Sequence, residues 1–170
     1  MRIAAFQQVE GLNLTLKGSE DEELSLRLHQ QGWKILRLDT EMVLHDAQMT
    51  KFSQWWQRKV RSGYSYAQRT WLHSASLESY YVRTNLSIWF WGYVLPLLCL
   101  SLFVPTSGIS LLFLAGYSIL IYRIYRHMKK RGFTTADSLL HTHFCILRKL
   151  PQVQGQIQFY IDKLFSFVTY

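Results

Sequence analysis

The chain has 170 residues, 49% of them hydrophobic, and a formal net charge of +8. Residues 1–85 carry eleven basic and nine acidic side chains, whereas residues 86–170 carry eight and two, so the basic excess lies beside the most apolar part of the chain. This distribution suits anionic lipid headgroups and argues against a nucleic-acid partner. The two cysteines, Cys99 and Cys145, have neither metal-ligand spacing nor the setting of a structural disulfide.

The first strong signal is a helix over residues 20–31. A capping box opens it at Ser19, two leucines four residues apart give it an apolar side, and Gly32 stands where a left-handed residue ends a helix. Four acidic residues in its first turn complement the helix dipole, and each stabilises the helix by about 0.3–1 kcal/mol. The same field keeps Asp21 ionised, as a general base requires, so the charges alone leave a structural and a catalytic explanation open.

Two short strands are predicted after this helix, near residues 33–35 and 43–45, and the second ends at His45. A single histidine at a strand end is commonly a packed or surface residue, so His45 needs support from its neighbours.

A longer helix is predicted over residues 51–71. Apolar and small side chains step along it by three or four positions, and a polar row follows another side. The apolar row is Phe52, Trp56, Val60, Gly63, Ala67 and Trp71, and the polar row is Gln54, Arg58, Arg61 and Ser65. The pattern fits an ordinary amphipathic helix with solvated arginines, and it equally fits an arginine pair that binds a diphosphate.

The order of these motifs resembles the acceptor-side half of family 2 glycosyltransferases, which have the GT-A fold. The residues that carry the resemblance are Arg2, Phe6, Val9, Gly11, Glu20, Asp21, Glu22, Glu23, Leu24, Arg27, Leu28, Gly32, Trp33, Lys34, Ile35 and His45. In that family the second residue of the Glu-Asp pair is the base of an inverting transfer. The resemblance therefore implies that Asp21 is the catalytic base, with Glu20 beside it, and that His45 lies near the metal and the diphosphate.

The start of the second helix is similar to the Gln-x-x-Arg-Trp motif of cellulose and hyaluronan synthases. Three residues separate Gln54 from Arg58, and Trp55 and Trp56 precede the arginine instead of following it. Processive polymerisation and transfer of single sugars therefore both stay open. The resemblance implies that Gln54, Arg58 and Arg61 steady the departing diphosphate and that Trp55 or Trp56 lines the acceptor channel.

No charged residue occurs between Arg83 and Arg123. The run predicts two membrane spans, Leu86–Val104 and residues 108–122, the second extending to about residue 125 to reach a comfortable length. A helical hairpin is the economical arrangement, because backbone amides in lipid must pair internally. Pro96 lies inside the first span and should distort it.

Basic residues flank the two spans on one side only, at Arg83 and within residues 123–131, so both termini are predicted to face the cytoplasm. Aromatic residues near both flanks fit a membrane-interface belt. We expect a multi-pass protein of a bacterial inner membrane. The alternative is a buried pair of apolar helices in a soluble protein.

The tail predicts two amphipathic helices. The first spans residues 136–150 with Thr135 as its cap and Pro151 as its end, and the second spans residues 155–168. Such helices fit either the membrane interface or the underside of a catalytic domain, and both placements stay open.

The predicted fold class is α/β, mostly helical in this chain. Residues 1–78 form the C-terminal part of a GT-A domain, residues 79–131 a transmembrane hairpin and residues 132–170 an amphipathic cytoplasmic tail. The resemblance implies a donor half that seats a nucleotide sugar and an Asp-x-Asp pair that holds Mg²⁺ or Mn²⁺. No two aspartates here are two apart, so the chain is expected to be the last part of a longer enzyme.

The expected function is transfer of a sugar, with inversion, from a nucleotide-sugar donor to a hydroxyl of a glycan or lipid-linked acceptor, as in polysaccharide biosynthesis. The alternatives are a non-catalytic membrane-anchored fragment, a membrane protein that docks a partner, and an interaction module with no transferase ancestry.

Overall fold

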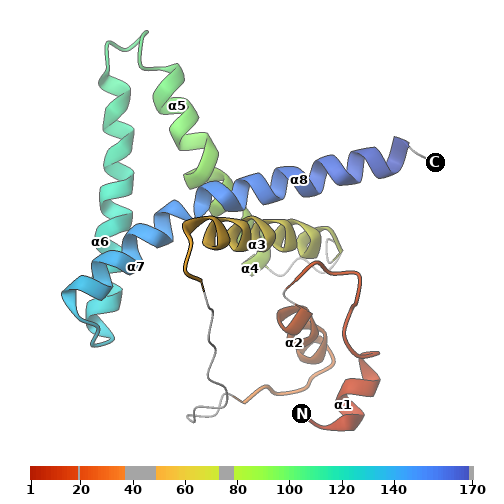
Figure 1. The fold of residues 1–170 in the computed structure, drawn as a ribbon. Helices are drawn as coiled ribbons and strands as arrows, with labels where there is room; N and C mark the ends of the chain where they lie inside the picture. The colour runs from red at the N-terminus through yellow and green to blue at the C-terminus, as the bar shows by residue number, and fades with distance from the viewer. Residues whose placement is uncertain (19, 37–48, 73–78, 169–170) are drawn as a thin grey trace.

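The computed structural model describes residues 1–18, 20–36, 49–72 and 79–168, and all regular structure in these ranges is helical (Figure 1). The elements in chain order are α1 (Ile3–Gln8), α2 (Glu20–Gln30), α3 (Phe52–Leu72), α4 (Ser79–Trp89), the π turn η1 (Phe90–Val94), α5 (Leu95–Ser101), the 3₁₀ turn η2 (Ile109–Leu114), α6 (Ala115–Lys130), α7 (Thr135–Leu147) and α8 (Lys149–Val168).

The predicted strand at residues 33–35 is wrong, because these residues are irregular in the structure. A strand needs a neighbour that satisfies its backbone donors and acceptors, and the described residues supply none there. The second predicted strand, with His45, and the capping residue Ser19 lie outside the described residues. The sheet of an α/β domain is therefore not seen in the described part of the chain, which is mostly helical.

Helices α1 and α2 form a small lobe, the α1–α2 lobe (residues 1–18 and 20–36). Its core joins Ala5 and Val9 of the first segment to Leu24 and Leu28, the predicted apolar pair of α2. Helix α2 ends at a left-handed glycine, as predicted. Gly32 has φ 81°, and the next amide, of Trp33, donates to the Leu28 carbonyl over 3.0 Å.

Helices α3 and α8 run side by side in the same direction and form the centre of the molecule (Figure 1). Two glycines permit their close approach. A methyl group at Gly63 would overlap the carbonyl oxygen of Gln152, and one at Gly155 would overlap that of Val60. The predicted helix over residues 51–71 is confirmed within one residue, and its small residues mark the face that meets α8.

The predicted faces of α3 are correct in the middle of the helix and wrong at its ends. Gly63 and Ala67 are buried, but Phe52 and Trp71 are about half exposed. Ser65 is fully buried, although it belongs to the predicted polar row. The reason is that a second segment covers α3, since the loop at Gly18 packs against Ser65.

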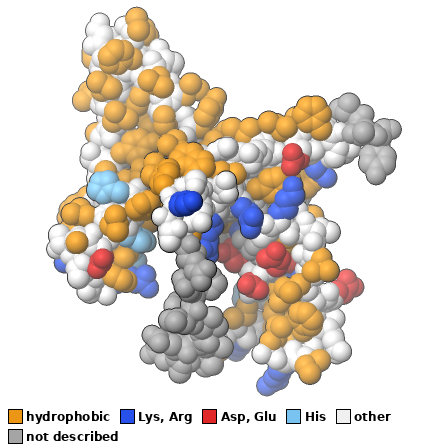
Figure 2. All heavy atoms as spheres, in the orientation of Figure 1, with side chains coloured by type: hydrophobic (Ala, Val, Ile, Leu, Met, Phe, Trp, Pro, Cys, Tyr) orange, Lys and Arg blue, Asp and Glu red, His pale blue; other side chains and the backbone are white. Residues whose placement is uncertain are grey.

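Two helical stretches are long and apolar enough to cross a membrane, Val82–Ser101 and Ile109–Lys130. They form a hairpin that rises on one side of α8, while the α1–α2 lobe lies on the other (Figure 1). Only 28% of the most apolar part of the first stretch and 6% of that of the second are buried within the protein, and hydrophobic side chains gather on the visible face of the hairpin (Figure 2). This exposure argues against the alternative of a covered helix pair in a soluble core.

The predicted distortion at Pro96 takes the form of the π turn η1, which lies immediately before α5. Proline has no N–H to donate and its ring crowds the carbonyl four residues earlier, so the helical ladder is interrupted there. Gly92 in this turn lets the hairpin approach α8, because a methyl group there would lie 2.7 Å from the Lys149 carbonyl oxygen.

The tail departs from its predicted boundaries. Thr134, and not Thr135, caps α7 by accepting the Asp137 amide over 3.1 Å. The prediction that Pro151 ends a helix is wrong, since Pro151 lies in the first turn of α8. A proline is tolerated there because the first turn has no intrahelical acceptor for its missing N–H.

Candidate functional site

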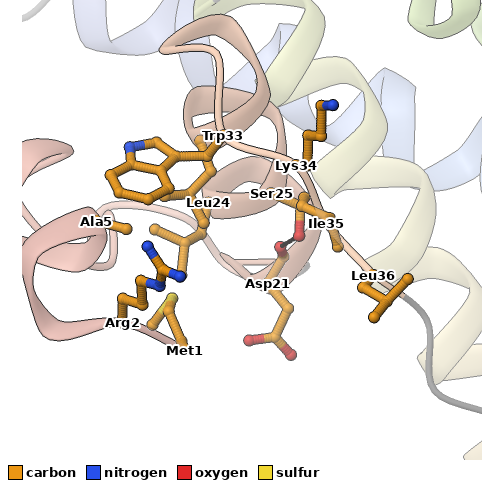
Figure 3. A pocket seen from close by; sticks show the side chains of 11 residues that line it. Met1, Arg2, Ala5, Asp21, Leu24, Ser25, Trp33, Lys34, Ile35 and Leu36 are labelled. Carbon is orange, nitrogen blue, oxygen red and sulfur yellow. Dashed lines mark hydrogen bonds between the residues drawn. The ribbon is translucent and has the colours of Figure 1, made fainter.

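Asp21 lines a pocket of about 620 Å³ in the α1–α2 lobe. Its walls come from α1, α2 and the segment after Gly32, and they include Arg2, Ala5, Leu24, Trp33 and Leu36 (Figure 3). Figure 3 shows the Asp21 carboxylate pointing away from Ala5, Leu24 and Trp33. The pocket therefore combines an apolar wall, an aromatic ring and one exposed carboxylate.

In the acidic first turn of α2, two carboxylates pair with arginines and two have no ion pair among the described residues. Glu23 is buried and accepts two hydrogen bonds from Arg27, at 2.8 and 2.7 Å. Glu22 forms an ion pair with Arg69 of α3, whose side chain is fully buried. Within the described residues the Asp21 carboxylate has no such partner, and only its backbone oxygen is bound, by the Ser25 hydroxyl over 2.7 Å. Glu20 likewise has no ion pair among the described residues, but of these two acids only Asp21 lines the pocket.

Arg27 fixes the backbone that forms the turn after α1. Its guanidinium donates to the carbonyl oxygens of Val9 and Gly11, the second over 2.7 Å. The Glu23–Arg27 pair therefore joins α2 to this turn. Glu23 and Arg27 are both among the residues that carry the family resemblance. In the structure they pair with each other and hold the backbone of this turn.

Gln54 and the two tryptophans lie at the start of α3, where they contact neighbouring helices. The Gln54 side-chain oxygen accepts the backbone amides of Thr50 and Lys51, at 3.0 and 3.1 Å, as a helix-capping side chain does. The Trp55 ring lies 5.0 Å from that of Phe144 in α7, and Trp56 donates to Gln154 of α8 over 2.9 Å. In the described residues these three side chains are thus engaged in structural contacts.

Arg61 lines a pocket that does not include Arg58. Arg61 lines a second, polar pocket of about 440 Å³ between α3 and α8. In that pocket Lys17 forms an ion pair with Asp162 over 3.5 Å, and the Tyr64 hydroxyl donates to the same carboxylate over 3.1 Å. The hydrogen bond with Tyr64 is the main reason that the pKa of Lys17 is raised, and Asp162 adds to it.

The predicted site residues do not line one common cavity in the described structure. Asp21 belongs to the first pocket and Arg61 to the second. Two contacts nevertheless join the start of α2 to α3, since a methyl group at Gly18 would lie 3.9 Å from the Arg61 side chain and Glu22 pairs with Arg69. His45 lies outside the described residues.

Among residues 1–18, 20–36, 49–72 and 79–168, no three side chains of His, Cys, Asp or Glu gather as a metal site. The Mg²⁺ or Mn²⁺ that the resemblance implies stays a prediction.

Sequence reasoning missed two contacts that organise the site. Arg69 continues the polar row of α3 by one helical step, and this position in the row was the available sequence signal. In the structure the arginine is buried and pairs with the acidic turn of α2. The contact of Lys17 with Asp162 joins residues 145 positions apart, and no local pattern reports it.

No family model matches the chain, and no curated protein or solved structure matches it either. The resemblance to family 2 glycosyltransferases therefore depends on the motifs themselves.

Proposed function

We propose that this chain is part of a membrane-bound, inverting glycosyltransferase of the family 2 type, and that Asp21 is its catalytic base. Asp21 would remove the proton of an acceptor hydroxyl, the oxygen would attack the anomeric carbon of a nucleotide sugar, and the nucleoside diphosphate would leave on the opposite face. Gln54, Arg58 and Arg61, with His45, are the residues that the resemblance assigns to the diphosphate.

The observation that carries this proposal is the division of labour in the first turn of α2. Glu22 and Glu23 are engaged with arginines, whereas the Asp21 carboxylate lines a pocket without a partner among the described residues. A general base must be ionised and within reach of the acceptor, and an exposed carboxylate near a helix N-terminus meets the first condition. Trp33 and Leu24 supply an apolar wall against which a sugar ring can pack.

The hairpin supplies the proposed anchor. We place the two apolar stretches across the membrane and the loop between them on the far side, because the basic residues lie at the other end. Both termini would then face the cytoplasm of a bacterial cell, where nucleotide sugars are available to a polysaccharide or lipid-linked glycan pathway.

The test is release of nucleoside diphosphate by the enzyme that contains this chain together with its donor half, purified in lipid nanodiscs, with a panel of nucleotide sugars, Mn²⁺ and membrane-lipid extract as acceptor. Asp21→Asn should lower turnover about 10²- to 10⁴-fold, because the base is removed, while nucleotide-sugar binding by calorimetry is retained. Asp137→Asn is the matched control, since it makes the same change in the first turn of another helix. Equal turnover in the Asp21 variant and the unmodified protein would show that Asp21 is not the base. No release with any donor would show that this chain takes no part in such a transfer.

A further inference from the structure

Four cations gather where α7 meets α8, beside the start of α3. This cationic cluster consists of Arg58, Lys59, Arg148 and Lys149. Lys149 reaches the hairpin, where its Nζ donates to the Ser87 hydroxyl of α4 over 3.2 Å. The Arg148 Nε is buried, and no group in the described part of the chain hydrogen-bonds to it. A buried donor of a charged group without an acceptor is costly, so an anion beside Arg148 would be favourable.

The charges around the cluster also favour an anion beside it. Burial, followed by the nearby Arg148 cation, lowers the pKa of Lys149 to about 8. Burial, and then the Arg148 and Arg58 cations, lower the pKa of Lys59 as well. The other titratable group that acts on both lysines is the Cys145 thiol, whose sulfur lies 3.5 Å from His141 Nδ1. No carboxylate of the described residues is among the charges that shift these two lysines.

An apolar cavity of about 510 Å³ adjoins the cluster. It lies between the hairpin and the α7–α8 joint, and its walls include Trp91, Pro96, Tyr117, Ile121, Ile146 and Leu150. Ser87 and Trp91 are one helical turn apart, so the Lys149 ammonium lies about 5–6 Å along the helix from the cavity wall. The residues on either side of Arg148 and Lys149, Leu147 and Leu150, belong to the same wall.

We propose that this cavity and the cationic cluster together bind one anionic phospholipid. Its acyl chain would occupy the cavity, and its phosphate would accept hydrogen bonds from Arg148, Lys149 and Lys59. The proposal depends on insertion of the hairpin into a membrane and not on sugar transfer, so it can fail or succeed independently of the proposed function.

A lipid fits this site better than a soluble anion for two reasons. The cavity wall is mostly apolar, and its ionisable side chains are His143 and Tyr117. Four of its residues come from the two helical stretches long enough to cross a bilayer, namely Trp91, Pro96, Tyr117 and Ile121. Such a wall suits an acyl chain better than a free phosphate. The cations lie at the cytoplasmic end of the proposed spans, where basic pockets between helices meet lipid headgroups.

The test uses the full chain in a neutral maltoside detergent, titrated with dioctanoyl phosphatidylglycerol, dioctanoyl phosphatidylcholine or inorganic phosphate. Phosphatidylglycerol should bind at least tenfold more tightly than either of the others. Replacing Lys59, Arg148 and Lys149 together by Gln should abolish that preference. The control replaces Lys129, Lys130 and Arg131 by Gln, which removes the same charge from the exposed end of α6. Equal losses in both triple variants would show diffuse attraction and overturn the site.

Two further readouts distinguish the sources of the phosphate and guard against a misfolded variant. The single change Lys149→Met keeps the aliphatic stem, and it should remove the fall in phosphatidylglycerol affinity that the unmodified protein shows as the pH rises through about 8. A brominated acyl chain should quench tryptophan fluorescence, and the quenched component should vanish in Trp91→Phe. Inorganic phosphate that binds as tightly as the lipid, or quenching that survives in Trp91→Phe, would contradict the proposal.

Discussion

Helix α8 and the α1–α2 lobe both pack against α3, but through different kinds of contact. Helix α8 meets α3 backbone to backbone at two glycines, and a buried polar network reinforces the junction, with Gln156 donating to Asn85 over 2.9 Å and Asn85 to Thr70 over 2.7 Å. The lobe contacts α3 mainly through side chains, by the Glu22–Arg69 pair and by Gln68, which donates to the Thr15 carbonyl over 2.9 Å.

The helices α3 and α8 thus form a closely packed framework, whereas the α1–α2 lobe holds the candidate site. Close backbone packing leaves few alternative arrangements, because interiors of this density do not deform continuously. A lobe attached by a few polar side chains has a small core of its own and can shift without disturbing the framework. The pocket that contains Asp21 belongs to the second kind of region.

The largest expected effect comes from the glycines of the framework. Gly155→Ala should destabilise the protein by at least about 3 kcal/mol, because the added methyl group forces α8 away from the Val60 carbonyl. Gly116→Ala in α6 is the control, since its methyl group would lie 3.5 Å from the Trp91 ring, at ordinary contact distance. Thermal or chemical unfolding in detergent measures both. Equal midpoints for the two variants would show that α3 and α8 are not packed this closely.

A smaller effect is expected where the lobe meets α3. Glu22→Gln removes the anionic partner of a buried arginine and should loosen α2 by about 1–2 kcal/mol, a figure limited by the exposure of Glu22. Hydrogen exchange should then accelerate in α2 about tenfold or more, while α8 keeps its protection. Asp21→Asn should accelerate exchange in α2 less, since it loses the helix-dipole contribution of about 0.3–1 kcal/mol but no ion pair among the described residues. Equal acceleration in α2 and α8 would mean that the lobe and the framework are one cooperative unit.

The smallest effect is expected at the exposed Lys17–Asp162 contact. Asp162→Asn should cost less than about 0.5 kcal/mol and less still at high salt, because both side chains are more than half exposed. The pKa of Lys17 is raised above its value of 10.5 in the unfolded chain, so its contribution is present below that pH and is lost as the pH rises through the higher folded value. Unfolding midpoints at pH 7 and above pH 11 measure it. A loss above about 1 kcal/mol would show a stronger contact than the structure indicates.

Local patterns predicted the helices and their faces where one partner covers one face. The capping box, the leucine pair and Gly32 predicted α2 to within a residue, because each of these signals acts within a few positions. The two apolar stretches were predicted for the same reason, although the first begins at Val82 and the second continues to Lys130.

The failures arose where a distant segment decided the outcome. Ser65 was assigned to the polar face of α3, and it is buried because the Gly18 loop covers it. The sequence predicts a helix end at Pro151, although a proline suits the first turn of a helix equally well. The structure shows that α7 ends before Arg148, so Pro151 lies in the first turn of α8. The roles of Asp21, Gln54, Arg58 and Arg61 in transfer stay predictions, since the residues by themselves do not report which reaction they serve.

The pairing of α3 with α8 has a consequence for biosynthesis. Trp56 and Gln154, which join the two helices, are 98 residues apart in the chain, and the whole apolar hairpin lies between them. During translation α3 leaves the ribosome long before its partner exists, so the glycine face stays uncovered while the hairpin is synthesised. The chain order therefore sets the order of assembly: synthesis of the hairpin precedes the docking that completes the framework, and a nascent chain stalled before α8 would be a natural substrate for chaperones.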